Sequence, residues 1–178
     1  ETATIIGDIN GDGLDDLLFG ASKRDLAIKS DVGATAVIFG AETITSTASF
    51  DISSLNGSNG FTIAGLNADD QFGRYASQIG DINGDGIDDF IISAYTDTNG
   101  VNAGSVYVLF GQTANQTSTV DLSALNGSNG FVINGINAND LTGSTVSFSN
   151  DINGDGFGDI LISADDASPN GKSDAGQS

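Results

Sequence analysis

Short apolar runs alternate along the chain with segments rich in Gly, Asn and Asp, and this pattern indicates a protein built of strands. The runs are too short for ordinary helices, and the polar segments between them are typical of turns. We expect four strands in the middle of the chain, at 75–80, 90–94, 105–111 and 131–135. The same template predicts six further strands, which makes ten strands and no helix: 4–8, 16–20, 35–40, 61–65, 145–149 and 160–164.

The strand pattern repeats. Segment 51–61 reappears 70 residues later as 121–131, and segment 33–40 returns as 104–111. A strand-rich repeat of this length is typical of β-propeller blades or a related array. We therefore expect an all-β fold of four-stranded antiparallel blades, divided as follows: a first blade at 1–65, a second at 66–135 and half of a third at 136–178.

Ten strands fill about two and a half blades, whereas a closed propeller has at least about four. We expect an open fragment, excised from a longer chain. Its unpaired strand edges are expected to pair with the remaining blades or with another copy.

An acidic loop joins the first expected strand of each repeat to the second. Counting its first Asp as position one, side chains that carry oxygen stand at positions one, three, five and nine, and Gly stands at position six. Ca²⁺ prefers about six to eight oxygen ligands, and a glycine permits the sharp turn that wraps a short loop around the ion. Position seven contributes a backbone carbonyl. We predict three structural calcium sites, with these ligands: Asp8, Asn10, Asp12, Leu14 and Asp16; Asp81, Asn83, Asp85, Ile87 and Asp89; Asp151, Asn153, Asp155, Phe157 and Asp159.

The alternative is that these loops are plain turns, in which Asp, Asn and Gly are also common. Three carboxylates within nine residues repel one another, and the threefold recurrence favours the metal site. The loops are not EF-hands, because position twelve is Phe19, Ile92 or Ile162 rather than Glu.

The charge of the chain limits its partners. It has 24 acidic and 5 basic residues, a net charge of −19, which three calcium ions would bring to −13. Nucleic acid and anionic membranes are therefore poor partners, and no apolar run suggests membrane insertion. The absence of Cys and His excludes disulfides and Ser-His or Cys-His catalytic pairs. Such a composition with calcium loops suits a secreted or cell-surface protein.

Several of these residues resemble the FG-GAP repeat of the integrin α-subunit β-propeller. They are Phe72-Gly73 before the second loop, the loop itself, and Gly20-Ala21 or Ser93-Ala94 after a loop. The proline of the motif is missing throughout, and the third copy has Thr142-Gly143 in place of Phe-Gly. The resemblance implies a seven-bladed propeller whose calcium loops rigidify one face while the opposite face receives ligands. The resemblance also implies that the chain is part of a large, modular secreted or surface protein, as its bacterial members resemble parts of such proteins.

All five basic residues fall in or beside the loops expected on the face opposite calcium: Lys23, Arg24, Lys29, Arg74 and Lys172. We interpret the chain as a non-catalytic calcium-binding module for cell adhesion or protein recognition, with a protein or glycan ligand on this face. The alternative is that Lys and Arg simply favour exposed loops. The tyrosines Tyr75, Tyr95 and Tyr107 are compatible with a carbohydrate platform or with packing on the sheets.

Two other functions remain open, namely a repeat region attached to a secreted hydrolase and a structural spacer of a large surface protein. Catalysis by the paired aspartates Asp69-Asp70, Asp88-Asp89 or Asp165-Asp166 is disfavoured. Adjacent residues of a strand point to opposite faces and do not meet one substrate.

Overall fold

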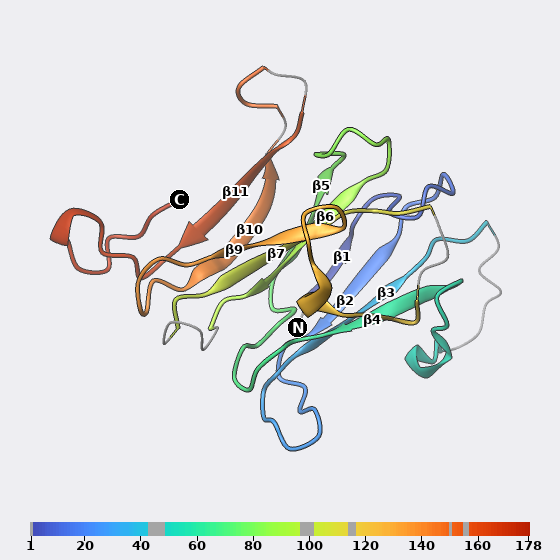
Figure 1. Cartoon of the computed structure of the whole chain (residues 1–178), viewed down its shortest axis with the longest axis horizontal. Helices are drawn as coiled ribbons and strands as arrows, with labels where there is room; N and C mark the ends of the chain where they lie inside the picture. Colours follow the sequence, from blue (N-terminus) through green and yellow to red (C-terminus); the bar gives the residue numbers. More distant parts are fainter. Residues whose placement is uncertain (1, 43–48, 97–101, 114–116, 150, 155–156) are drawn as a thin grey trace.

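The computed structural model describes residues 2–42, 49–96, 102–113, 117–149, 151–154 and 157–178. These residues are almost wholly β, in three separate sheets that stand side by side (Figure 1). No sheet closes on itself within the described residues. The expected open arrangement of antiparallel blades is confirmed.

The first sheet has the strand order β1-β2-β3-β4-β8, and the second has the order β5-β6-β7-β9. The strands of the first sheet are β1 (Thr2–Ile5), β2 (Leu17–Ala21), β3 (Ala34–Ile38), β4 (Gly60–Ala64) and β8 (Thr119–Val120). Those of the second are β5 (Ala76–Gly80), β6 (Asp89–Ala94), β7 (Ser105–Leu109) and β9 (Gly130–Asn134). The third sheet consists of β10 (Thr142–Ser149) and β11 (Asp159–Ala164).

Ten of these strands lie where the sequence predicts them, with ends that shift by a few residues, and two features differ from the prediction. The strand β8 was not expected. It pairs in parallel with β4, through Thr62 with Thr119 and Ile63 with Val120, so a segment of the second repeat extends the first sheet. Two residues are too few to show a period of two, which is why the pattern missed them.

The prediction of no helix is also wrong, because the described residues include three 3₁₀ turns: η1 (Ile52–Ser54), η3 (Leu122–Ala124) and η4 (Pro169–Gly171). Asp51 and Asp121 cap the first two by accepting the N–H groups of Ser53 and Ser123, each at 2.9 Å. An Asp two residues before a Ser is a local signal for such a cap.

The central strands of the middle sheet, β6 and β7, are buried along their whole length, because this sheet is covered on both faces. Phe90 and Ile92 of β6 pack with Leu18 and Phe61 of the first sheet. Ile91, between them in the sequence, packs in a second cluster with Val146 and Phe148 of β10 and with Ile160 of β11. Neighbouring sheets are therefore joined by apolar cores, as stacked β-sheets require.

The outer face of the first sheet has no such cover within the described residues. Leu17 and Phe19 of β2 are each 39% exposed, whereas Leu18 on the inner face is fully buried. The 3₁₀ turns show the same contrast, because Leu122 is 4% exposed and its counterpart Ile52 is 46% exposed. Equivalent residues of the repeat thus differ only in what lies against them.

Candidate functional site

The three predicted calcium loops connect β1 to β2, β5 to β6 and β10 to β11, and each connects an antiparallel pair. Because the pairs are equivalent, the loops come to the same end of the three sheets (Figure 1). The strands thus bring together loops that are about 70 residues apart in the sequence.

The first loop folds around the carboxylate at position one. Asp8 accepts the N–H groups of Gly11 at 2.8 Å and Asp12 at 3.0 Å through Oδ1, and that of Gly13 at 2.7 Å through Oδ2. Asp12 itself accepts the N–H of Leu14 at 2.9 Å, and Asn10 Oδ1 accepts that of Asp12 at 2.9 Å. These bonds curl the backbone into a tight turn.

The second loop repeats this pattern. Asp81 accepts the N–H groups of Gly84 at 2.7 Å, Asp85 at 3.1 Å and Gly86 at 2.8 Å. Asn83 and Asp85 accept those of Asp85 and Ile87, each at 2.9 Å. The glycine at position six is required by its backbone conformation, because Gly86 has φ +87°, in the left-handed region that favours glycine. Lack of space is not the reason, since a Cβ there would meet nothing within 4 Å.

The carboxylate at position nine is buried in the first two loops. Asp16 accepts the N–H of Ile9 at 3.0 Å and that of Gly40 at 2.8 Å, and both Asp16 and Asp89 are fully buried. Asp89 accepts the equivalent bonds from Ile82 at 3.0 Å and Gly111 at 2.9 Å.

This environment raises the pKa of both Asp16 and Asp89 to about 6. Loss of hydration on burial is the main cause, and the negative charges at positions one and five add to it. The two N–H donors of each carboxylate act in the opposite direction, because they stabilise its charged form.

The third loop is only partly described, since Asp155 of the predicted ligands lies outside the described residues. Asp151 accepts the N–H of Gly154 at 2.5 Å, and Asp159 accepts that of Ile152 at 2.6 Å and the side-chain amide of Asn153 at 3.3 Å. Asp159 is half-buried, and Phe157 at position seven is exposed.

Across the described part of the chain, no three acidic side chains stand close enough to form a ready-made metal cage. The structure places the predicted ligands along the same short loops, where they bind backbone N–H groups. Calcium coordination by these residues stays a prediction.

One contact between the loops was missed by the sequence reasoning. Asp88, at position eight of the second loop, accepts the N–H of Asp8 through Oδ2 at 3.1 Å, and its own N–H donates to the Asp8 carbonyl at 3.2 Å. The sequence does hold a signal for this contact, because position eight is acidic in the first two loops, Asp15 and Asp88, and is Gly158 in the third. The first and second loops are therefore directly coupled.

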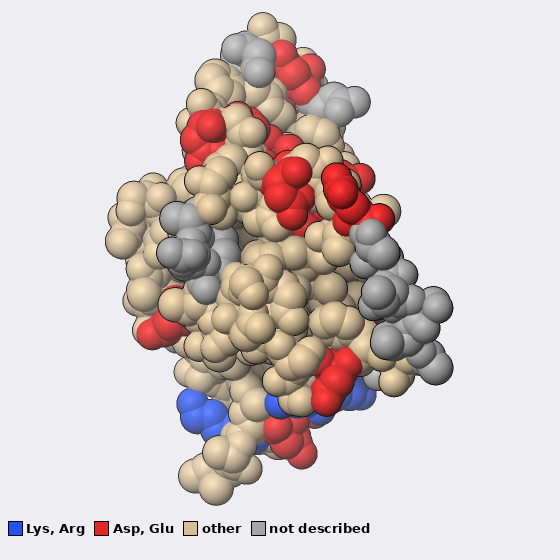
Figure 2. Space-filling view, turned by 90° about the vertical axis from the view of Figure 1, so that its right-hand side faces the viewer, with Lys and Arg blue, Asp and Glu red and all other residues tan. Residues whose placement is uncertain are grey.

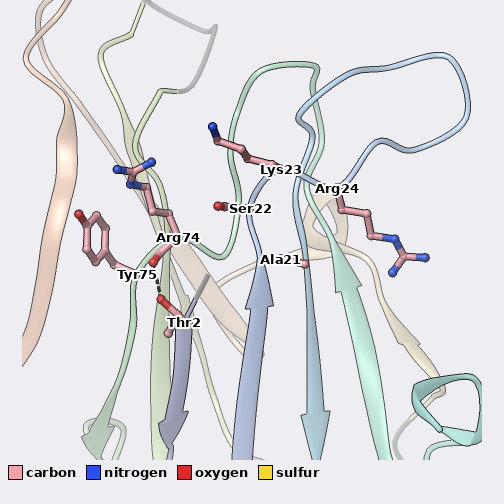
Figure 3. Close-up of a pocket in the computed structure, with 7 residues that line it drawn as sticks. All are labelled: Thr2, Ala21, Ser22, Lys23, Arg24, Arg74 and Tyr75. Atoms are coloured by element: carbon pink, nitrogen blue, oxygen red, sulfur yellow. Dashed lines mark hydrogen bonds between the residues drawn. The ribbon is translucent and has the colours of Figure 1, made fainter.

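The basic residues gather at the end of the molecule away from these loops, with a few acidic residues beside them (Figure 2). A pocket of about 500 Å³ opens there between the first and second sheets (Figure 3), and the residues that line it are Thr2, Ala21, Ser22, Lys23, Arg24, Arg74 and Tyr75. We refer to it as the basic pocket.

Two tyrosines hold the guanidinium group of Arg74. Its central carbon lies 4.7 Å from the ring centre of Tyr95 and 5.8 Å from that of Tyr75, and the two rings meet edge to face at 6.3 Å. The third tyrosine, Tyr107, is buried and packs on Phe72 at 5.6 Å. All three rings therefore have packing partners on or beside the sheets.

Comparison with known proteins identifies the repeats. The model of the FG-GAP repeat matches residues 74–109 and 142–178. The chain is 31% identical over 125 residues to Integrin alpha-PS2 of Drosophila melanogaster, a match that covers 66% of this chain and 8% of that protein. The chain thus spans a small part of this relative's length. With its repeated loops and its row of open antiparallel sheets, the chain carries two FG-GAP repeats and is an integrin-like, partial β-propeller.

Proposed function

We propose that the chain is a calcium-binding, non-catalytic β-propeller module for adhesion or protein recognition in a secreted or cell-surface protein. In this proposal the blades divide at residues 65 and 135, and one calcium ion stabilises the first hairpin of each blade. The observation that carries it is the identical fold of the first two acidic loops, each with a buried carboxylate at position nine.

The residues of these loops suit Ca²⁺. The proposed ligands are all oxygen atoms, from carboxylates, a side-chain amide and the carbonyl at position seven, which is the chemistry that a hard cation prefers. The raised pKa of Asp16 and Asp89 shows that a negative charge at position nine is unfavourable in the protein alone. A divalent cation at each loop would offset that cost and the repulsion between positions one and five.

The recognition part of the proposal draws on the integrin relative and on the separation of charge between the two ends of the molecule. Extracellular placement draws on the same relative and on a chain without Cys. Among the described residues, a helix with the length and apolarity needed to span a bilayer is absent.

Two of the three aspartate pairs have a buried member, and these buried carboxylates give no support to catalysis. Asp70 is buried and accepts the backbone and side-chain N–H groups of Asn67 at 2.8 Å and 3.1 Å, so it closes a turn. Asp89 is buried in the second loop. A carboxylate held in this way lacks the access to substrate that acid or nucleophilic catalysis needs.

Thermal unfolding in Ca²⁺, in Mg²⁺ and in EDTA tests the calcium part of the proposal. A site filled at 100 times its Kd stabilises the folded state by about 2.7 kcal/mol, so we expect a clearly higher Tm in Ca²⁺ than in EDTA. The matched variants are Asp85→Asn, which removes the negative charge of a proposed ligand, and Asp51→Asn, which removes a negative charge outside the loops. Equal melting temperatures with and without calcium would refute calcium binding.

A further inference from the structure

The basic pocket concentrates positive charge in a strongly acidic chain. Three of its seven lining residues are cations, Lys23, Arg24 and Arg74, and no carboxylate is among the residues that line it. Within the described residues, none of the three forms an ion pair with Asp or Glu. Among the described residues, these three charges therefore have no carboxylate partner within the chain.

Arg74 is held in a fixed position. Besides its stacking on Tyr95 and Tyr75, its Nη1 donates to Gln71 Oε1 at 3.2 Å. Its backbone is fixed as well, because the Thr2 hydroxyl donates to the Arg74 carbonyl, a bond drawn in Figure 3. A guanidinium group that is ordered in advance loses less side-chain entropy when it binds an anion.

Lys23 and Arg74 project toward the same open side of the pocket, whereas the guanidinium group of Arg24 points away from them (Figure 3). Lys23 and Arg74 come from different sheets, since Lys23 follows β2 and Arg74 precedes β5. A planar guanidinium beside a mobile ammonium is a suitable pair for a carboxylate, which accepts two N–H groups from the first and one from the second.

The aromatic rings argue against a sugar as the ligand. Stacking of a sugar needs a free aromatic face, and Arg74 already lies over Tyr95 and Tyr75. A pocket of about 500 Å³ accommodates one or two acidic side chains.

We propose that the basic pocket binds side-chain carboxylates of an acidic peptide segment in a protein partner, with Lys23 and Arg74 as the binding residues. The inference deepens the proposed recognition function and rests on it. It assigns the ligand an anionic character, and it places the contact at the junction of the first two sheets.

The test uses the full chain in excess Ca²⁺ at an ionic strength of about 0.15 M, which screens the long-range repulsion of an acidic ligand. The probe is a fluorescent hexaglutamate peptide with blocked ends, and binding is followed by anisotropy. Hexaglutamine with the same label is the uncharged control, and a heparin-derived hexasaccharide is the sulfated-sugar probe.

We expect hexaglutamate to bind and hexaglutamine not to bind. Lys23→Gln and Arg74→Gln should each weaken the binding of hexaglutamate roughly tenfold, the loss of a charge-assisted hydrogen bond. Lys172→Gln is the matched control, because it changes the net charge equally at an exposed position outside the pocket. Its affinity should stay close to that of the unchanged chain.

Three results would overturn the inference: no binding of hexaglutamate, equal losses in Lys23→Gln and Lys172→Gln, or binding of the hexasaccharide without the peptide. If Arg74→Gln fails to fold, the exposed Lys23 decides the question. The Tm of the same sample with and without calcium separates the two proposals. A chain that is stabilised by calcium but does not bind hexaglutamate contradicts the pocket inference alone.

Discussion

The second and third acidic loops share the same ligand pattern but differ in their surroundings. Asp89 is fully buried and accepts the N–H of Gly111, which follows the third strand of its sheet. Asp159 is half-buried, and the groups it accepts within the described residues, Ile152 and Asn153, belong to its own loop. In the described residues the third sheet has two strands. The burial of position nine is therefore provided by the completed sheet and not by the loop sequence.

A second difference lies between adjacent loops. Asp88 joins the first loop to the second, whereas Gly158 at the same position of the third loop has no carboxylate to offer the second. A side chain there would also clash, because a Cβ on Gly158 would meet the ring of Phe148. Asp88 thus couples the first two loops by hydrogen bonds, whereas the third loop approaches the second through the ring of Phe157, which lies 3.4 Å from the place of a Cβ on Gly84.

The largest expected effect comes from pH in EDTA, because Asp16 and Asp89 both contribute. Their pKa in the folded protein, about 6, lies above the value of about 3.9 in the unfolded chain. Their contribution to stability is thus fully present below about pH 4 and is lost as pH rises through 6. We expect the free energy of unfolding, measured with urea, to fall over this range.

The control is the double variant Asp16→Asn/Asp89→Asn, which has no carboxylate at position nine of either loop. Its unfolding free energy should change less over the same pH range, although its overall stability is lower. Excess Ca²⁺ should also flatten the profile of the unchanged chain, since the ion favours the charged form. A double variant with an unchanged pH slope would show that other carboxylates cause the effect.

These positions also show how far the sequence predicts the site. The recurrence of Asp and Asn at fixed positions predicted the loop and its glycine, because those residues determine the local backbone. The sequence did not predict that Asp16 and Asp89 are buried, since the N–H groups of Gly40 and Gly111 come from segments that follow the neighbouring strand, 24 and 22 residues away in the sequence. Burial of this kind depends on contacts between distant segments.

The next effect in size concerns the buried carboxylate itself. Asp89→Ala removes the acceptor of two N–H groups, those of Ile82 and Gly111, and each unsatisfied group costs about 1–3 kcal/mol. We expect a loss of about 3 kcal/mol, measured by urea unfolding in EDTA so that the loss of a calcium ligand does not add to it. The equivalent Asp159→Ala should cost about 1 kcal/mol, because water replaces its bonds at a half-exposed site. Equal losses would remove the distinction between the two loops.

The strands were predicted more completely than the contacts between the sheets. Ten strands could be predicted because each has an apolar run of its own, with the length or alternation typical of a strand. The strand β8 has no such run and forms because it pairs with the edge of β4 in another repeat. The same holds for Leu122 and Ile52, which occupy equivalent positions but are buried and exposed, respectively. Local sequence determines these elements, and the neighbouring sheet determines whether they are covered.

The smallest effect tests the coupling of the first two loops. Asp88→Ala removes the acceptor of the Asp8 N–H, a partly buried hydrogen bond worth about 1 kcal/mol. Its matched control is Asp15→Ala, at the same position of the first loop, where the exposed carboxylate has no hydrogen-bond partner among the described residues. Hydrogen exchange of the Asp8 amide should become faster in Asp88→Ala and stay unchanged in Asp15→Ala, because only the first variant frees that N–H. If both variants leave the exchange unchanged, the two loops are held together by the packing of their sheets and not by Asp88.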